Sequence, residues 1–246
     1  MRSIFWVVAA SAALVACGAG GLTAAATGTG TGTGTSTPDS LLGIYSGASV
    51  QGSISKSIYG VFLNSGEYYF AEFVSGQAAE LVHGTSVPQG GTLNSNDMMD
   101  FPAPLNPLSG SFAGTYVLNS GVNGSLNYAN NVVTPQNLTL TYQTNSNAQQ
   151  LLTAVARSWS FTDNATASGT LTVGVNGNIT GSTSTGCTLS GNMLPGNAAY
   201  ALSLNMTNCT VSGSLTGVAV LPPGTNNLIL MALTPTRNGA WVALAN

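Results

Sequence analysis

Five carboxylates are the residues best suited to chemistry, and they gather in one stretch of the chain: Glu67, Glu72, Glu80, Asp97 and Asp100. Glycoside hydrolysis uses carboxylates in pairs, because one protonates the leaving group while the other attacks the sugar or activates water. Glu72 shares its strand parity with Phe70, so its side chain is expected to point toward an aromatic side and to be partly buried. One hypothesis is therefore a hydrolase that uses Glu72 with Asp97 or Asp100. The other, which we favour, is that these carboxylates are solvated on a hairpin and a loop.

His83 is the only histidine, and the sequence lacks the groups that nucleophilic or metal chemistry would need around it. A serine nucleophile requires an adjacent base, and no Gly-x-Ser-x-Gly turn occurs to present one. Zinc takes three or four Cys, His or carboxylate ligands, and one histidine with two cysteines expected to be bridged cannot supply them. We interpret His83 as a loop or rim residue, and we predict no catalytic residue, no metal and no cofactor.

An aromatic stretch lies next to the carboxylates and contains Tyr68, Tyr69, Phe70 and Phe73. Aromatic rings can form a stacking platform for sugars, which would suit a carbohydrate-active protein. Such side chains also pack across neighbouring strands in a β core. We favour core packing.

Basic residues are too few for a polyanionic partner. Only 4% of the chain is charged, and Lys56, Arg157 and Arg237 are the basic residues beyond Arg2. Binding to phosphate backbones requires clustered Lys and Arg, and so does a polybasic attachment to a membrane surface. We therefore predict no nucleic-acid partner.

The first residues of the chain have the features of an export signal. Arg2 precedes an apolar run over residues 4–16, which is shorter than the roughly 20 residues of a membrane-spanning helix. The run ends in Leu14-Val15-Ala16-Cys17, which resembles the lipobox of bacterial lipoproteins. The resemblance implies that the signal peptide, residues 1–16, is removed and that Cys17 becomes the lipidated first residue, with fatty-acyl chains such as palmitate. An ordinary signal peptide that happens to contain a cysteine is the alternative.

The segment after Cys17 is expected to tether a folded domain to the membrane. In the Gram-negative sorting system that the lipobox resembles, Asp after the cysteine retains a lipoprotein in the inner membrane, so Gly18 implies the outer membrane. The periplasmic side and the cell surface both stay open. Residues 17–40 are rich in Gly and Thr and offer no apolar face, which indicates a flexible coil. A β-strand of alternating Thr and Gly is the alternative.

The remaining cysteines suit an exported protein. With Cys17 lipidated, Cys187 and Cys209 form an even pair, and disulfides persist outside the reducing cytoplasm. We predict a disulfide between them, with two free buried thiols as the alternative. The apolar face switches from even-numbered residues at Met206 to odd-numbered residues at Cys209, so a bulge or break is expected at residues 207–208.

Residues 41–246 are predicted to form a single all-β domain, either an antiparallel β-sandwich or a β-barrel-like sheet. Apolar and polar residues alternate with period two over residues 138–143, 171–176 and 200–207. Residues 228–233 are apolar throughout, which indicates a strand covered on both sides. The one candidate helix spans residues 148–157, and residues 101–107, with three prolines, are expected to be an extended loop.

From residue 167 onward the layout resembles a type of uncharacterised β-rich outer-membrane lipoprotein of Gram-negative bacteria. The shared features are Gly186-Cys-Thr-Leu-Ser-Gly191 and Asn208-Cys-Thr-Val-Ser-Gly213, and the opening Gly43-Ile-Tyr-Ser-Gly47 fits as well. The resemblance implies a β-rich exported domain and no known activity.

These observations favour a non-catalytic outer-membrane lipoprotein. Its lipid anchor would attach it to the membrane, and its β domain would bind an envelope protein or a glycan, or have a structural role at the cell envelope. The alternatives are the hydrolase described above and an adhesin displayed at the cell surface.

Overall fold

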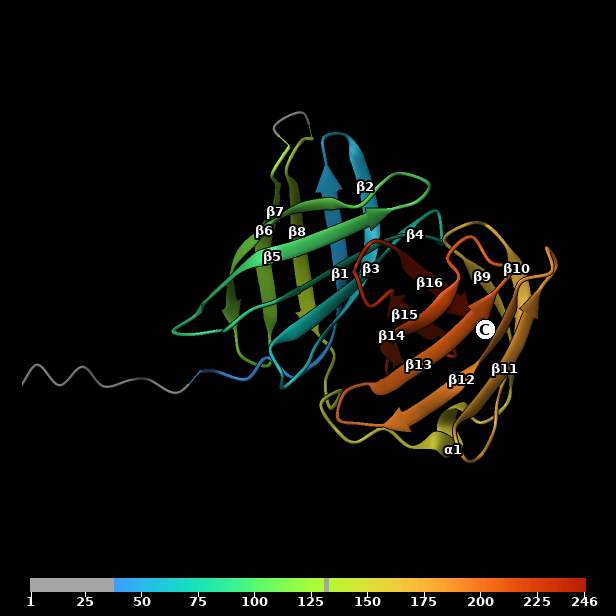
Figure 1. The fold of residues 1–246 in the computed structure, drawn as a ribbon. Coiled ribbons are helices and arrows are strands. Elements are labelled where there is room, and N and C mark those ends of the chain that lie inside the picture. Colours follow the sequence, from blue (N-terminus) through green and yellow to red (C-terminus); the bar gives the residue numbers. More distant parts are fainter. Residues whose placement is uncertain (1–37, 131–132) are drawn as a thin grey trace, which may run out of the picture. The chain divides into compact units, whose positions relative to one another are not determined.

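The computed structural model describes residues 38–130 and 133–246, which belong to one compact unit. These residues form two closed barrels of antiparallel strands, one after the other along the chain (Figure 1). The all-β prediction is confirmed, and the barrel is the correct one of the two expected architectures. The division of the strands into two closed barrels was not anticipated. Cys17 and the signal peptide lie outside the described residues, as does nearly all of the expected tether.

The first barrel contains strands β1 to β8, each paired with the next along the chain. Their bounds are β1 Gly43–Gln51, β2 Ile54–Phe62, β3 Glu67–Val74, β4 Gln77–Thr85, β5 Thr92–Pro102, β6 Leu108–Val117, β7 Gly121–Tyr128 and β8 Gln136–Tyr142. Pairing of β8 with β1, which sets Tyr142 opposite Tyr45, closes the ring.

The second barrel repeats this arrangement with strands β9 to β16. Their bounds are β9 Ser158–Asp163, β10 Ser168–Val173, β11 Asn178–Thr183, β12 Thr188–Pro195, β13 Tyr200–Thr207, β14 Gly213–Val220, β15 Leu228–Leu233 and β16 Ala240–Ala245. Closure comes from β16 and β9, where Ala243 lies opposite Asp163.

The period-two alternation of apolar and polar residues places apolar side chains inside each barrel, because successive side chains point to opposite faces of a strand. The first barrel encloses aromatic and aliphatic side chains, among them Tyr45, Phe70, Phe112, Leu126 and Leu140. The second encloses, among others, Trp159, Leu171, Met193, Leu204 and Trp241. One predicted strand position is wrong: β10 ends at Val173, and Val175 lies in the following turn with 82% of its surface exposed.

A third apolar cluster joins the outer faces of the two barrels. It contains Tyr69, Ala71, Phe73 and Leu81 from β3 and β4, and Val220, Ile229, Met231 and Val242 from β14 to β16. Strand β15 is therefore buried along its whole length, as its unbroken apolar sequence predicted. The four aromatic residues of the stretch from Tyr68 to Phe73 are also buried, Tyr68 and Phe70 inside the first barrel and the others between the barrels.

The hairpin between β2 and β3 shows how a local sequence signal sets a turn. Gly66 has φ +86°, a left-handed conformation that costs other residues energy, and an added Cβ would lie 2.6 Å from the carbonyl oxygen of Ser86. The Asn64-Ser65-Gly66 sequence therefore permits both the turn and the close approach of a neighbouring loop.

The connection between the barrels contains the one helix among the described residues, α1 Leu152–Val155. It is much shorter than the predicted segment 148–157, because Ser158 already begins β9. The expected proline loop is also shorter than predicted. Phe101 and Pro102 still belong to β5, and the turn follows them. Proline is compatible with a strand end, where its missing N–H breaks no ladder bond.

The disulfide between Cys187 and Cys209 is formed, with 22 residues separating the cysteines. Cys187 precedes β12 and Cys209 follows β13, and these neighbouring strands pair Thr188 with Thr207. The predicted break after Thr207 is confirmed, since β13 ends there and Asn208 has φ +58°. The bond therefore fastens the ends of two paired strands.

No helix among the described residues has the length and apolar character needed to cross a membrane.

Candidate functional site

The acidic residues singled out in the sequence lie in two separate places. Glu72, Glu80 and Asp100 gather inside the first barrel. Glu72 and Glu80 contact Lys56, and Asp100 lies near both glutamates. Glu67 and Asp97 lie on the outside of that barrel, near Arg237 of the second barrel.

The barrel cluster, as we name the first group, is made by polar side chains from different strands: Lys56 (β2), Glu72 (β3), Glu80 (β4), Asp100 (β5), Tyr128 (β7) and Gln136 (β8). All except Glu80 are buried, and Glu72 exposes none of its surface. Lys56 has the inward parity of Ile58, and Gln136 has that of Leu138, so the strand register itself carries these side chains into the barrel.

Glu72 contacts two nitrogen atoms at once. The Lys56 Nζ lies 3.0 Å from Oε2 of Glu72, and Gln136 donates a hydrogen bond from Nε2 to Oε1 of the same carboxylate. Lys56 also lies 2.6 Å from Oε1 of Glu80 and donates a hydrogen bond of 3.3 Å to Oε1 of Gln136. The amine, the amide and the carboxylate therefore form a closed triangle of contacts.

Asp100 and Tyr128 complete the cluster. Tyr128 donates its hydroxyl proton to Oδ2 of Asp100 over 2.7 Å, and its oxygen also lies 3.3 Å from Oε1 of Gln136. Burial, followed by the nearby Glu80 charge, raises the pKa of Asp100 to about 8. Asp100 is thus protonated at neutral pH, and its buried Oδ1 has no hydrogen-bond partner.

The remaining ionisable groups of the barrel cluster support each other's charge. Burial raises the pKa of Glu72, and the adjacent Lys56 opposes that shift. Burial alone would lower the pKa of Lys56, but the two carboxylates beside it raise that pKa above its ordinary value. The cluster therefore holds one paired cation inside the first barrel.

The geometry bears on the proposed hydrolytic pairs. Glu72 and Asp100 come together, but both are buried in the barrel, with 0% and 1% of their surfaces exposed. Asp97 has other partners: Thr85 and Ser95 donate hydrogen bonds to its carboxylate. The expectation that these carboxylates are solvated on a hairpin and a loop is wrong for Glu72 and Asp100, because the strand register turns both inward.

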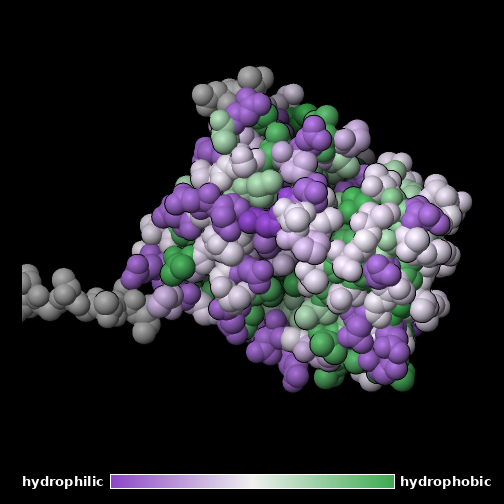
Figure 2. Space-filling model, in the orientation of Figure 1, coloured by the Kyte–Doolittle hydropathy of each residue, from purple (hydrophilic) through white to green (hydrophobic). Residues whose placement is uncertain are grey.

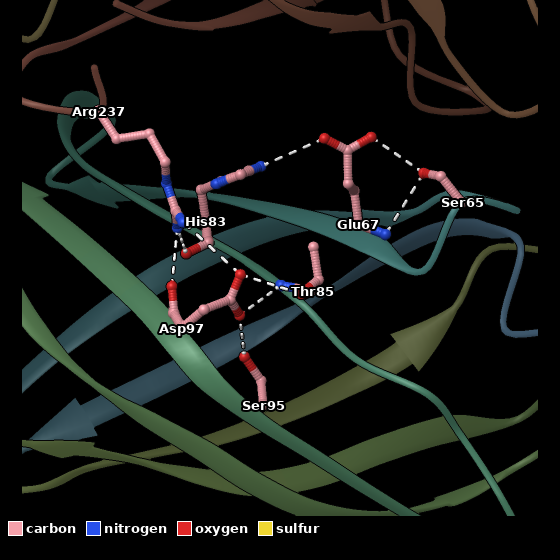
Figure 3. Close-up of polar contacts among 7 residues, drawn as sticks. All are labelled: Ser65, Glu67, His83, Thr85, Ser95, Asp97 and Arg237. Atoms are coloured by element: carbon pink, nitrogen blue, oxygen red, sulfur yellow. Dashed lines mark hydrogen bonds and ion pairs between the residues drawn. The ribbon is translucent and has the colours of Figure 1, made fainter. Parts of the chain in front are cut away.

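The second group, the Arg237 cluster, links the two barrels (Figure 3). Arg237, from the turn between β15 and β16, donates hydrogen bonds to the backbone carbonyl oxygens of His83 and Asp97 at 3.1 and 2.8 Å. Its guanidinium also lies 3.5 Å from the Asp97 carboxylate, with both side chains partly exposed. Burial alone would raise the pKa of Asp97, but hydrogen bonds from Thr85 and Ser95 lower it. Asp97 is thus an ionised anchor for Arg237.

His83 lies inside the Arg237 cluster and not at a rim, contrary to the sequence interpretation. It exposes 6% of its surface and packs against Tyr69, with ring centroids 4.5 Å apart. Neither imidazole nitrogen has a hydrogen-bond partner, and the nearest carboxylate oxygen, of Glu67, is 3.7 Å away. Burial and then the Arg237 charge lower the pKa of His83 to about 4, so the ring is neutral at physiological pH.

A cleft of about 600 Å³ lies among loops of both barrels. We name it the loop cleft and define it by residues 103–107 after β5, 164–167 after β9, 209–211 after β13 and 238–239 before β16, with Asp163, Cys187 and Trp241 at its wall. Its volume is in the range of ligand-binding pockets. Alanines, asparagines, prolines and threonines predominate in these loops, and Leu105 lines the cleft with 70% of its surface exposed.

Asp163 is the one charged residue among those that line the loop cleft. Its Oδ1 accepts hydrogen bonds from the backbone N–H groups of Ala165 and Ala167, and its Oδ2 accepts one from Nε1 of Trp241. Both oxygens are thus engaged within the chain. The cleft is consequently suited to an uncharged, partly apolar occupant.

Figure 2 shows hydrophilic and hydrophobic residues interspersed over the face that it presents, with a hydrophilic band along β5.

Within the described residues, no group of three or more His, Cys, Asp or Glu side chains is arranged to hold a metal ion.

The roles of Lys56, Tyr128, Gln136 and Arg237 were not anticipated from the sequence. A signal for two of them was present, since Lys56 and Gln136 share inward parity with apolar neighbours in their strands. Nothing in the sequence indicated Arg237 or the loop cleft, because both depend on how segments more than 100 residues apart meet.

Comparison of the sequence with protein-family models and with curated proteins finds no match.

Proposed function

We propose that this chain is a lipid-anchored outer-membrane protein that binds an uncharged segment of another envelope protein in the loop cleft. The observation that carries the binding proposal is the cleft itself. Loops from both barrels line it, it has the volume of a binding pocket, and its one charged side chain is already fully hydrogen-bonded.

The composition of the cleft supports a protein partner. Proline and leucine offer apolar contact, while threonine and asparagine offer hydrogen bonds that fix the orientation of a bound chain. An ionised partner would lose its hydration in this cleft without gaining a counter-charge, which disfavours binding. Leu105 lines the cleft and is highly exposed, so it is well placed to contact a partner.

The proposed anchor rests on the lipobox-like sequence that ends at Cys17 and on the Gly/Thr-rich tether after it. Substitution Cys17→Ser should abolish labelling by a fatty-acid analogue. The variant should also no longer partition into the detergent phase of a membrane extract. A variant that still partitions like the wild type would overturn the anchor while leaving the cleft proposal untouched. Protease treatment of intact cells distinguishes the periplasmic side from surface display, and surface display would favour the adhesin version of this function.

The binding proposal is tested by comparing two exposed apolar positions. Cells that produce the full chain are treated with a membrane-permeable crosslinker, and crosslinked partners are recovered under denaturing conditions. Leu105→Asp should reduce recovery of a specific partner at least tenfold, because an uncompensated charge would enter the cleft. Val175→Asp is the matched control: Val175 is 82% exposed but does not line the cleft, and this variant should retain the partner. Equal recovery with both variants would rule out the cleft as the binding site.

A further inference from the structure

The barrel cluster places a nucleophile, an acyl group and a proton carrier in direct contact. The nucleophile is the amine of Lys56, and the acyl group is the side-chain amide of Gln136, whose Oε1 lies 3.3 Å from Lys56 Nζ. The proton carrier is Glu72, which touches the Lys56 nitrogen with Oε2 and the Gln136 nitrogen with Oε1. No function described above uses these contacts.

We propose that Lys56 and Gln136 become joined by an intramolecular isopeptide bond, formed within the folded first barrel with release of ammonia. The structure represents the reactants before the bond forms. This assignment is independent of the lipid anchor and of the loop cleft.

The reaction is an aminolysis of one amide to give another. The Lys56 ammonium first gives a proton to Glu80, whose Oε1 is 2.6 Å away. The neutral amine then attacks Cδ of Gln136, and a new C–N bond forms as the carbonyl oxygen takes on negative charge. Glu72 accepts the second proton from the attacking nitrogen and passes a proton to the departing nitrogen of Gln136. The old C–N bond breaks, and ammonia leaves, carrying the proton held by Glu80 away as ammonium.

Each step has a group in position to assist it. The developing oxyanion at Oε1 of Gln136 lies 3.3 Å from the Tyr128 hydroxyl, which can redirect its proton there from Asp100. Glu72 is fully buried, and burial raises the pKa of its carboxyl group, which favours uptake of the proton in transit. No oxidant, metal or external reactant is required.

The barrel also supplies the conditions under which an amine and an amide react slowly but completely. The strands hold both groups in contact for the life of the protein, and a fixed geometry of this kind raises the effective concentration of the reactants greatly. Gln136 and Glu72 expose none of their surfaces, so water competes poorly with the amine. The product would join β2 to β8 across β1, which pairs with both.

Mass spectrometry of the purified full chain tests the proposal directly. The intact denatured protein should be lighter than its sequence by one ammonia, apart from signal removal and lipidation. Digestion at aromatic residues should yield one branched peptide in which Lys56 is joined to Gln136. The bond would also close a loop between residues separated by 80 positions, so the denatured, reduced chain should migrate faster in a denaturing gel.

Three substitutions make the test specific. Lys56→Arg keeps the cation and its ion pairs but removes the amine nucleophile, so both the mass loss and the fast migration should disappear. Glu72→Gln removes the proton carrier and should slow the reaction at least a hundredfold, whereas Asp97→Asn changes a carboxylate outside the barrel cluster and should retain the bond. Asn-Gly pairs such as Asn123-Gly124 also lose ammonia on forming succinimides, but that loss would persist in Lys56→Arg.

The outcomes separate cleanly. A folded wild-type protein with unmodified mass overturns the proposal, and so does a mass loss that Lys56→Arg does not abolish. Loss of water with a Lys56–Glu72 branched peptide would also overturn it, because Glu72 would then be the acyl group and not the proton carrier.

Discussion

The two barrels share strand number and connectivity but are filled with different chemistry. The first encloses interlocking Tyr and Phe rings and the barrel cluster, whereas the second encloses Trp159, Trp241, methionines and aliphatic side chains. Among the described residues, Asp163 is the one buried charged side chain of the second barrel, and a disulfide closes one of its hairpins. A closed sheet therefore requires a filled interior but does not dictate its polarity.

The stabilities of the two barrels should therefore respond differently to pH, to loss of the disulfide and to loss of a charged partner. Apolar burial does not depend on protonation, so the second barrel should respond to loss of its disulfide more than to pH. Buried charges are stable only while paired, so the first barrel should respond to pH and to loss of one partner. If residues 1–16, which contain Trp6, are removed as proposed, Trp159 and Trp241 remain, and because both lie in the second barrel their fluorescence reports on that barrel.

The largest expected effect is the loss of the buried cation. Compared with Lys56→Arg, which keeps the cation and likewise cannot form the isopeptide bond, Lys56→Met should leave Glu72 buried without its counter-charge and destabilise the first barrel by about 3–5 kcal/mol. Urea unfolding followed by far-UV circular dichroism should show this loss, while the tryptophan transition shifts less. Unchanged unfolding of Lys56→Met would mean that the cluster contributes nothing to the fold.

Reduction of the disulfide should produce the complementary result. Opening the bond between Cys187 and Cys209 restores conformational entropy to the unfolded chain, at a cost of about 3 kcal/mol of stability. The tryptophan transition of the second barrel should move to lower urea concentration on reduction. A double variant with serine at both positions should already unfold at that lower urea concentration, and adding reductant should not shift its transition further. A shift confined to the first barrel would contradict the assignment.

The pH dependence of the first barrel should follow Asp100. Its pKa in the folded protein, about 8, lies above that of a carboxyl group in an unfolded chain, so the folded state binds the extra proton. The stability from this group is therefore present at low pH and declines as the pH rises toward 8, by up to about 1.4 kcal/mol per pH unit.

Asp100→Asn tests this dependence because the amide is neutral at every pH and can still accept the Tyr128 hydrogen bond. The variant should gain stability relative to the wild type as the pH is raised from about 6 to 8, reaching about 2–3 kcal/mol. Parallel stability curves for the two proteins would show that Asp100 is ionised in the folded state.

Salt should have the smallest effect on either barrel. The partly exposed ion pair between Arg237 and Asp97 contributes about 0–1 kcal/mol, and burial shields the charged groups of the barrel cluster from counter-ions. Moving from low to moderate sodium chloride should shift both transitions by less than about 1 kcal/mol. A large loss in salt would mean that surface charges hold the barrels together.

Much of the strand content could be predicted from local patterns. The alternation in residues 200–207 matches β13, and the unbroken apolar run of 228–233 matches β15. The parity switch before Cys209 located the end of β13, and the two cysteines predicted the disulfide. These features depend on neighbouring residues, for which period and parity are sufficient information.

Other features were decided only by the tertiary structure. Alternation indicates which face of a strand is buried but not which strands pair, so the sequence alone could not distinguish one barrel from two. It suggested that Glu72 points inward, but only the closed ring brings Lys56, Gln136 and Asp100 to it from three other strands. The loop cleft and the Arg237 contacts likewise require the two barrels to meet. Which polar groups lie together is thus a property of strand register and closure, and these are set by long-range pairing and not by any local run of residues.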